Sequence, residues 1–192
     1  MLEEEYQATH RPSQAQRNLP PLEVPFEYTV RSAVEGDLPD VREIYNHYVA
    51  NSTVTFDEDA MTLKEWKHKF HRVSELGFPF LVAQSPSGQL LGFAYVYPWK
   101  EKAAYRYTVE NSIYLGAAST GKGLGKVLMA ELMDGAKAAG IKEIIAVIAD
   151  KGAEASIAMH KNFGFKEIGH MGKVGYKFGR WLGTVLMQRS LK

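Results

Sequence analysis

The chain has 192 residues, of which 45% are hydrophobic and 23% charged, and its formal net charge is +1. This length and composition suit one globular domain with its own core. A net charge so close to zero provides no long-range field that would attract nucleic acid or an anionic membrane. The absence of cysteine excludes disulfides, thiolate metal sites and a cysteine nucleophile.

The N-terminal region shows no signal peptide, and no apolar stretch of the chain is long enough to span a bilayer. We therefore expect a cytoplasmic protein. Residues 1–26 are polar and carry four prolines, which predicts a disordered tail, an expression remnant or an arm against a partner subunit. Residues 27–192 are expected to form the folded domain.

The folded part is expected to open with a short strand at residues 28–31, followed by two helices. Asp37 is placed to cap the first helix, and Pro39 suits its first turn. The second helix is expected to begin at the capping box formed by residues 62–65, Thr-Leu-Lys-Glu, and to end near Gly77.

Strands are predicted next. Residues 80–83 and 90–97 are apolar and flank a Ser-Pro-Ser-Gly turn, a pattern typical of an antiparallel hairpin. A further strand is expected at residues 109–115.

The second half of the domain has a different pattern. A helix with leucines four apart follows a glycine-rich turn and ends at Gly140. The continuous apolar run at residues 144–149 is typical of a strand buried on both faces. A short helix ends near Gly164, and strands are expected at 165–168 and 181–191 with a loop between them. The whole is predicted to be one mixed α/β domain, with an antiparallel first half and a strand–helix–strand unit in the second.

The glycine-rich turn holds Gly121, Gly123 and Gly125 at the start of a helix. Glycine permits positive φ and allows a ligand to approach the backbone closely. The unpaired N–H groups of a helix N-terminus attract phosphate. The turn therefore predicts a site for a pyrophosphate, without identifying which ligand carries it.

Two nucleotide-binding motifs fit this turn incompletely. The segment from Gly116 to Lys122 matches the beginning of a P-loop, but Gly123 stands where the magnesium-binding Ser or Thr is needed. The dinucleotide motif G-x-G-x-x-G would require a glycine at position 126, which is Lys126.

Residues 120–125, Thr-Gly-Lys-Gly-Leu-Gly, resemble the acetyl-CoA signature of the GNAT acetyltransferases, R/Q-x-x-G-x-G/A. Thr120 replaces the usual Arg or Gln. Residues 155–165 resemble the family's second coenzyme-binding helix, which closes with Gly-Phe. The element order from Thr29 onward is also similar to the GNAT fold. The resemblance implies a single α/β (α+β) domain, in which helices flank a mixed central sheet and splayed central strands bind acetyl-CoA.

The resemblance also implies which residues contact the coenzyme. Pantetheine would pair with the strand that bulges away from its neighbour, the pyrophosphate would lie on the glycine turn, and the second helix would approach both. The residues concerned are Ile113, Tyr114, Leu115, Thr120, Gly121, Lys122, Gly123, Leu124, Gly125, Lys126, Ser156 and His160.

Within the GNAT proteins, the chain is similar to phosphinothricin and methionine sulfoximine/sulfone acetyltransferases. Residues 105–114 and 174–182 carry this resemblance, and the Lys-Phe-Gly-Arg-Trp-Leu run favours the methionine sulfoximine branch. The chain departs from the pattern where Asn111 replaces a common His, Ala153 a frequent Asn and Gly183 a common Asp.

Acetylation of an amine requires a base, because an ammonium has no lone pair with which to attack a thioester. Glu110 lies on the strand just before the glycine turn and is the expected base, which is also the role that the resemblance implies. Arg106 is suited to hold a substrate carboxylate. Three aromatic residues on flanking loops are candidates for the wall of the substrate pocket: Phe56, Tyr97 and Trp99.

The leading hypothesis is an acetyl-CoA-dependent N-acetyltransferase that acetylates a small, amino-acid-like amine by direct transfer. A protein or peptide N-acetyltransferase and a non-catalytic acetyl-CoA sensor stay open as alternatives. The six histidines show no metal-ligand spacing, so no metal is expected. The resemblance implies a homodimer, and neither nucleic acid nor a membrane is an expected partner.

Overall fold

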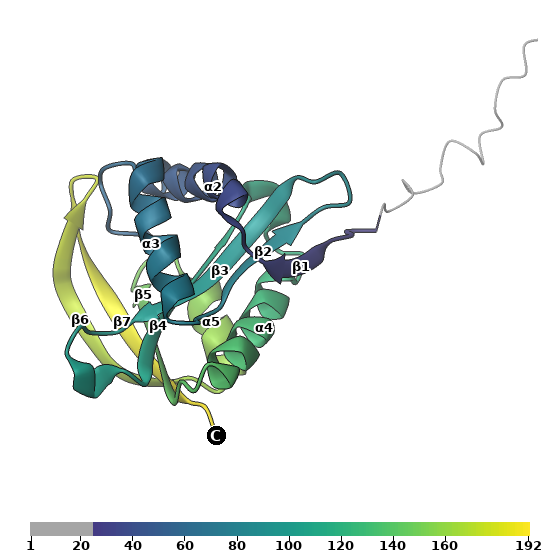
Figure 1. The fold of residues 1–192 in the computed structure, drawn as a ribbon. Coiled ribbons are helices and arrows are strands. Elements are labelled where there is room, and N and C mark those ends of the chain that lie inside the picture. The colour runs from purple at the N-terminus through teal and green to yellow at the C-terminus, as the bar shows by residue number, and fades with distance from the viewer. Residues whose placement is uncertain (1–24) are drawn as a thin grey trace, which may run out of the picture.

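The structure is a computed structural model that describes residues 25–192. Residues 1–24, most of the predicted N-terminal extension, lie outside the described residues. Seven strands form one sheet in the order β1-β2-β3-β4-β5-β7-β6 (Figure 1). The strands are β1 (Thr29–Ser32), β2 (Phe80–Gln84), β3 (Leu90–Pro98), β4 (Thr108–Leu115), β5 (Glu143–Ala149), β6 (Lys166–Lys177) and β7 (Arg180–Ser190). The α-helices are α2 (Leu38–Asn51), α3 (Leu63–Glu75), α4 (Leu124–Ala138) and α5 (Glu154–Asn162), with 3-10 turns η1 (Glu35–Asp37), η2 (Ala103–Tyr105) and η3 (Ala117–Ser119).

The helices lie on both faces of the sheet, so the domain has two apolar cores. On one face, α2 and α3 pack on β2 and β3 through buried residues that include Leu38, Trp66 and Phe93. On the other face, α4 packs through Leu128 and Leu132. Successive side chains of a strand point to opposite faces, so β2 and β3 supply apolar residues to both cores and are buried along almost their whole length.

The central strands β4 and β5 separate part-way along their length. They are the parallel pair of the sheet, and they pair only from Thr108↔Glu143 to Glu110↔Ile145. Beyond Glu110, β4 keeps its pairing with β3 as far as Leu115, whereas β5 pairs with β7. The expected splay of the central strands is therefore confirmed, and it begins directly after Glu110.

Most predicted elements are confirmed, including the hairpin β2–β3 and the capping box of α3. The Thr62 hydroxyl accepts a hydrogen bond from Glu65 N at 3.2 Å, and Thr62 N donates to the Glu65 carboxylate at 2.7 Å. The expected role of Asp37 is wrong. It occupies the N-cap position of α2 without capping it, because its carboxylate accepts hydrogen bonds from Arg31 and Val34 N instead.

The expected loop between residues 168 and 181 is also wrong, because β6 continues to Lys177 and pairs with β7. This edge strand is mostly exposed, so it lacks the alternation of apolar and polar residues that marks a half-buried strand. Its register shifts twice, between Glu167 and Gly169 and between Met171 and Gly175. These bulges interrupt the sequence pattern further.

Candidate active site

The glycine-rich turn connects η3 to α4 in a conformation that requires glycine. Gly121 and Gly123 have φ values of 74° and 83°, which other L-residues adopt only with strain. No atom lies within 4 Å of the position that a Cβ would occupy on either residue. Gly123 is the N-cap of α4, and no side-chain hydrogen bond caps this end of the helix. The turn therefore offers open space in front of helix N–H groups, a geometry that fits a pyrophosphate.

The other residues of the turn, which were predicted to contact the coenzyme, differ in their burial and in the contacts that they make. Lys122 places its ammonium 4.6 Å from the centroid of the Phe26 ring, and the Thr120 hydroxyl donates to Ala117 O at 3.1 Å. Leu124 is fully buried in the core, so only its backbone faces the turn. A Cβ on Gly125 would lie 3.4 Å from Met159 Sδ, which indicates that this glycine allows α4 to approach α5. Lys126 is exposed.

Glu110 is the last residue of β4 that pairs with β5, so it lies at the point where the strands separate. It is directly opposite Tyr97 on β3, and residues opposite each other share one face of a sheet. The side chain is half-buried. Burial raises the pKa of Glu110, and the positive charges of Lys69 and Lys100 oppose this rise. A carboxylate with a raised pKa is suited to accept a proton near neutral pH.

Beyond Glu110, the diverging part of β4 is supported by aromatic residues of α2. The Tyr114 ring lies 5.0 Å from the ring of Tyr45 and 5.4 Å from that of Tyr48. Tyr48 Oη donates to Leu115 O at 2.7 Å. Burial raises the pKa of Tyr114 well above its ordinary value, so its hydroxyl stays protonated. Ile113, Tyr114 and Leu115 are thus held in place without pairing to β5.

A buried polar contact connects this strand to α5 on the other face. Asn111 Nδ2 lies 2.9 Å from His160 Nε2, and His160 Nδ1 lies 2.8 Å from Ser156 O. A carbonyl only accepts, so Nδ1 carries the proton and Nε2 accepts from Asn111. Burial lowers the pKa of His160, which favours this neutral form. Both ring nitrogens are occupied, so the side chain links β4 to α5, and contact with the coenzyme through these nitrogens would require the link to open.

Three of the four predicted substrate residues lie around one cavity. Tyr97, Trp99 and Arg106 line a space of about 520 Å³ between α3 and the loop that follows β3. Arg106 is exposed, and its guanidinium lies 4.6 Å from the Tyr107 ring centroid. Phe56 does not line this cavity but packs elsewhere. The other residues around the cavity are Arg72, Leu76, Phe78, Pro98, Lys100, Glu101, Lys102, Ala103 and Thr108.

Comparison with known proteins identifies the family. Residues 30–186 match the family model described as an acetyltransferase (GNAT) domain. The chain belongs to the GNAT acetyltransferase family. The expectation of a GNAT fold and of an acetyl-CoA-dependent acetyltransferase is therefore confirmed.

This GNAT protein is similar in sequence to several named acetyltransferases. It is 38% identical over 163 residues to a phosphinothricin N-acetyltransferase from Alcaligenes faecalis, which covers 85% of this chain and 82% of the relative. It is also 38% identical to the L-methionine sulfoximine/L-methionine sulfone acetyltransferase of Pseudomonas aeruginosa, over 85% and 94% of the two chains. A phosphinothricin acetyltransferase from Sinorhizobium meliloti, solved with acetyl-CoA, superposes with a TM-score of 0.81 at 41% identity, over 85% and 88% of the chains.

In this acetyltransferase, the loop that carries Phe56 is held by the C-terminal strands. Lys177 is 2% exposed, and its ammonium donates to Ser52 O and Thr55 O, at 2.9 Å each. A Cβ on Gly175 would lie 2.5 Å from two carbons of the Phe56 ring. Phe56 is therefore packed against the backbone of β6, and this contact depends on a glycine at position 175.

We predict that Lys177→Met lowers the free energy of unfolding by about 1–3 kcal/mol, because two carbonyls lose a charged donor. The matched control is Lys166→Met, since Lys166 is an exposed residue of the same strand. Urea denaturation of both variants measures the effect. Equal stability of Lys177→Met and the control would show that the ammonium does not hold the loop.

Asp150 explains why residue 183 is a glycine in this chain, where the methionine sulfoximine and phosphinothricin acetyltransferases commonly have an Asp. A Cβ on Gly183 would lie 2.5 Å from the Asp150 carboxylate. Gly183 N donates to Asp150 Oδ1 at 3.0 Å, and His170 Nε2 lies 3.1 Å from Asp150 Oδ2. The carboxylate of Asp150 thus occupies the space beside β7 that a side chain at position 183 would need.

Two lysines whose positive charge lowers the pKa of Glu110, Lys69 and Lys100, were not predicted from the sequence. Lys69 follows the buried Trp66 by one helical turn on α3, and that spacing was the available signal. Lys100 lines the same cavity as Tyr97 and Trp99. Neither position belongs to the motifs that identify the family.

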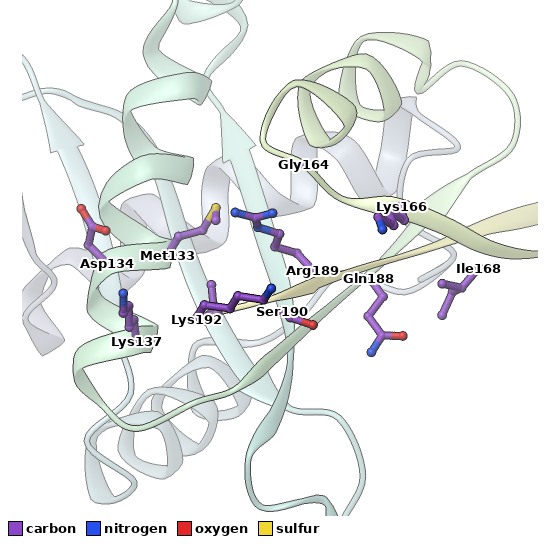
Figure 2. Close-up of a pocket in the computed structure, with 11 residues that line it drawn as sticks. Met133, Asp134, Lys137, Gly164, Lys166, Ile168, Gln188, Arg189, Ser190 and Lys192 are labelled. Atoms are coloured by element: carbon purple, nitrogen blue, oxygen red, sulfur yellow. The ribbon is translucent and has the colours of Figure 1, made fainter.

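A second cavity lies apart from these residues, between the C-terminal part of α4 and the strands β6 and β7 (Figure 2). Its volume is about 570 Å³, and the charged residues around it are Asp134, Lys137, Lys166, Arg189 and Lys192. It is the larger of the two cavities, but none of the predicted site residues lines it. Neither cavity is lined by Glu110 or by the glycine turn.

Two further properties concern residues 25–192 as a whole. Within this part of the chain, no group of three or more His, Asp or Glu side chains has an arrangement that would hold a metal ion. None of the helices described there combines the length and the apolar character that crossing a membrane requires.

Proposed function

We propose that this GNAT enzyme acetylates the primary amine of a small, acidic, amino-acid-like substrate of the methionine sulfone, methionine sulfoximine or phosphinothricin type. The observation that carries the proposal is the position of Glu110. It is half-buried where β4 leaves β5, and it shares a sheet face with Tyr97, which lines the adjacent cavity. The names of the relatives agree with this substrate class.

In the proposed reaction, Glu110 accepts a proton from the substrate ammonium, directly or through water. The amine nitrogen then attacks the thioester carbonyl carbon, and its lone pair forms the new C–N bond. Between Ile113 and Leu115, backbone N–H groups on the edge of β4 that β5 leaves unpaired would donate to the developing oxyanion. Collapse of the tetrahedral intermediate breaks the C–S bond and releases the thiolate, which needs little assistance as a leaving group. The second proton of the attacking nitrogen passes to this thiolate, directly or through water, so that the products are the neutral amide and the free thiol of CoA. No covalent enzyme intermediate is needed.

The cavity supports a small substrate over a protein substrate. A volume of about 520 Å³ is in the range of small-molecule sites, and a peptide would need a longer open groove. The lining carries four cationic side chains, Arg72, Lys100, Lys102 and Arg106, and one acidic side chain, Glu101. This excess of positive charge favours a substrate with an acidic group.

We also propose a homodimer in the cytoplasm, with neither nucleic acid nor a membrane as partner. The homodimer would form through β6 and β7. Their exposed apolar residues include a cross-strand pair, Tyr176 and Trp181, with ring centroids 5.3 Å apart and each side chain 56% exposed. Exposed apolar side chains gathered on one hairpin indicate an interaction surface. The remaining members are Ile168, Met171, Val174 and Phe178.

We predict that the wild type is dimeric in light scattering at micromolar concentration and that Trp181→Lys is a monomer. The exposed and distant Glu131→Lys, on α4, is the control for an added lysine. A monomeric wild type would contradict the assignment of this surface.

The substrate class is tested by release of thiol from acetyl-CoA across a panel of amines. The panel holds methionine sulfone, methionine sulfoximine, phosphinothricin, polyamines, aminoglycosides and peptides. The enzyme adds no background to a thiol reagent, because it has no cysteine. Turnover restricted to the first three compounds supports the proposal. Turnover of peptides alone would favour a peptide acetyltransferase, and acetyl-CoA binding without any turnover would favour a sensor.

A further inference from the structure

Lys69 on α3 holds its ammonium group above three aromatic rings. Its Nζ lies 5.3 Å from the ring centroids of Trp66 and Tyr95 and 5.7 Å from that of Tyr97. It also donates to the Tyr95 hydroxyl at 3.3 Å. A cation within about 6 Å of an aromatic centroid is attracted by the ring. These contacts fix the position of a side chain that is otherwise long and flexible.

The same contacts place Lys69 beside Glu110. Tyr97 is directly opposite Glu110 in the β3–β4 pairing, and Tyr95 is opposite Ser112. Opposite residues of an antiparallel pair have Cβ atoms about 4.5–5.5 Å apart on one face of the sheet. An ammonium above the Tyr97 and Tyr95 rings therefore lies over the face from which Glu110 projects. Its positive charge lowers the pKa of Glu110.

Lys69 has no carboxylate partner in the described part of the chain. No Asp or Glu oxygen among residues 25–192 lies within 4.0 Å of its ammonium. By contrast, the exposed Lys67 on the same helix pairs with Glu35 at 2.7 Å. Lys69 is half-buried as a residue, and its ammonium has three donors, of which one is used. Two donors remain for a ligand.

We propose that Lys69 binds the carboxylate of the substrate and thereby selects amines that carry an acidic group next to the reacting nitrogen. This inference rests on the proposed function. An α-amino acid carries its amine and its carboxylate on one carbon atom, so the cation that holds the carboxylate must lie beside the base. Lys69 meets this requirement. Arg106, the residue expected from the sequence, is exposed and stacked on Tyr107 at the rim of the cavity.

The test compares two ligands that differ only in this charge, methionine sulfone and its methyl ester. The variants are Lys69→Met, which keeps the apolar stem over the rings, and the control Lys67→Met. We expect Lys69→Met to lower kcat/KM for the acid about 10–100-fold, as for loss of a charge-assisted hydrogen bond. The change in kcat/KM for the ester should be much smaller, because the ester is affected only through the influence of Lys69 on Glu110. The wild-type preference for acid over ester should disappear. The amines of the acid and of the ester differ in basicity, but this difference is the same for every variant. Comparing the acid-to-ester ratio of kcat/KM between variants therefore removes its effect.

Calorimetric titration of both ligands into the enzyme saturated with CoA provides a second readout, independent of turnover. Weaker binding of the acid alone in Lys69→Met supports the inference, and equal weakening of acid and ester overturns it, because Lys69 would then act only through Glu110 or the fold. An unchanged acid-to-ester ratio in both assays also overturns it. A wild type that binds methionine sulfone but transfers no acetyl group would refute the proposed function, while the binding data would still decide the role of Lys69.

Discussion

Glu110→Gln is expected to lower kcat/KM for the amine substrate about 10²–10⁴-fold, the usual contribution of a positioned general base. The amide has nearly the same shape but does not accept the ammonium proton. Affinity for acetyl-CoA should stay unchanged, because the glycine turn and the diverging part of β4 are separate from this side chain. Steady-state thiol release and calorimetry with acetyl-CoA measure the two quantities. Glu131→Gln, an exposed change on α4, is the matched control.

The pH dependence provides an independent test of the same role. The base acts in its ionised form, and burial raises the pKa of Glu110 above the ordinary value of about 4.3. Wild-type kcat/KM should therefore be full at pH values above this raised pKa and fall as the pH drops through it. The residual kcat/KM of Glu110→Gln should not show this fall at low pH. If Glu110→Gln kept both the wild-type kcat/KM and its fall at low pH, Glu110 would be excluded as the base.

Trp66→Ala is expected to lower the free energy of unfolding by about 3–5 kcal/mol, the usual cost of removing a buried tryptophan. Trp66 is completely buried, and its ring meets those of Tyr45, Phe93 and Tyr95 edge-on at 5.4, 5.6 and 6.0 Å. It anchors α3 to the sheet, and the centroid of its ring lies 5.3 Å from the ammonium of Lys69. Urea unfolding monitored by far-UV circular dichroism measures the loss.

Trp66→Phe separates apolar packing from hydrogen bonding at this position. Within residues 25–192, Trp66 Nε1 is buried and has no hydrogen-bond partner, so phenylalanine removes a polar group that contributes no bond. We expect a clearly smaller loss of stability for Trp66→Phe than for Trp66→Ala. Equal losses in the two variants would indicate that the indole N–H makes a hydrogen bond that is needed for folding.

The parts of the fold predicted correctly from the sequence are those that local chemistry determines. The capping box at Thr62 satisfies helix N–H groups with side chains only three residues apart. Gly121 and Gly123 mark a turn that needs positive φ, and the apolar run from Ile144 marks a strand buried on both faces. The position of Glu110 follows in turn, because the strand before the glycine turn must be β4.

The parts that were missed depend on contacts between distant segments. Lys177 is separated by more than 120 residues from the carbonyls it binds, and nothing in the local sequence distinguishes it from a solvated lysine. Lys69 acquires its position from Tyr95 and Tyr97 on β3. Asp37 was expected to cap α2, but Arg31 on β1 binds its carboxylate instead. In each case tertiary packing decides between two local options.

The most direct test of the account is a single-turnover reaction of excess enzyme with deuterated acetyl-CoA and methionine sulfone, followed by mass spectrometry of product and protein. We predict that the trideuteroacetyl group appears on the amine of methionine sulfone at the rate at which free thiol is released. The intact protein should carry no label, and Glu110→Gln should slow both events equally. Label that appears first on the protein, or thiol release without acetylated amine, would contradict direct transfer to a small amine at Glu110.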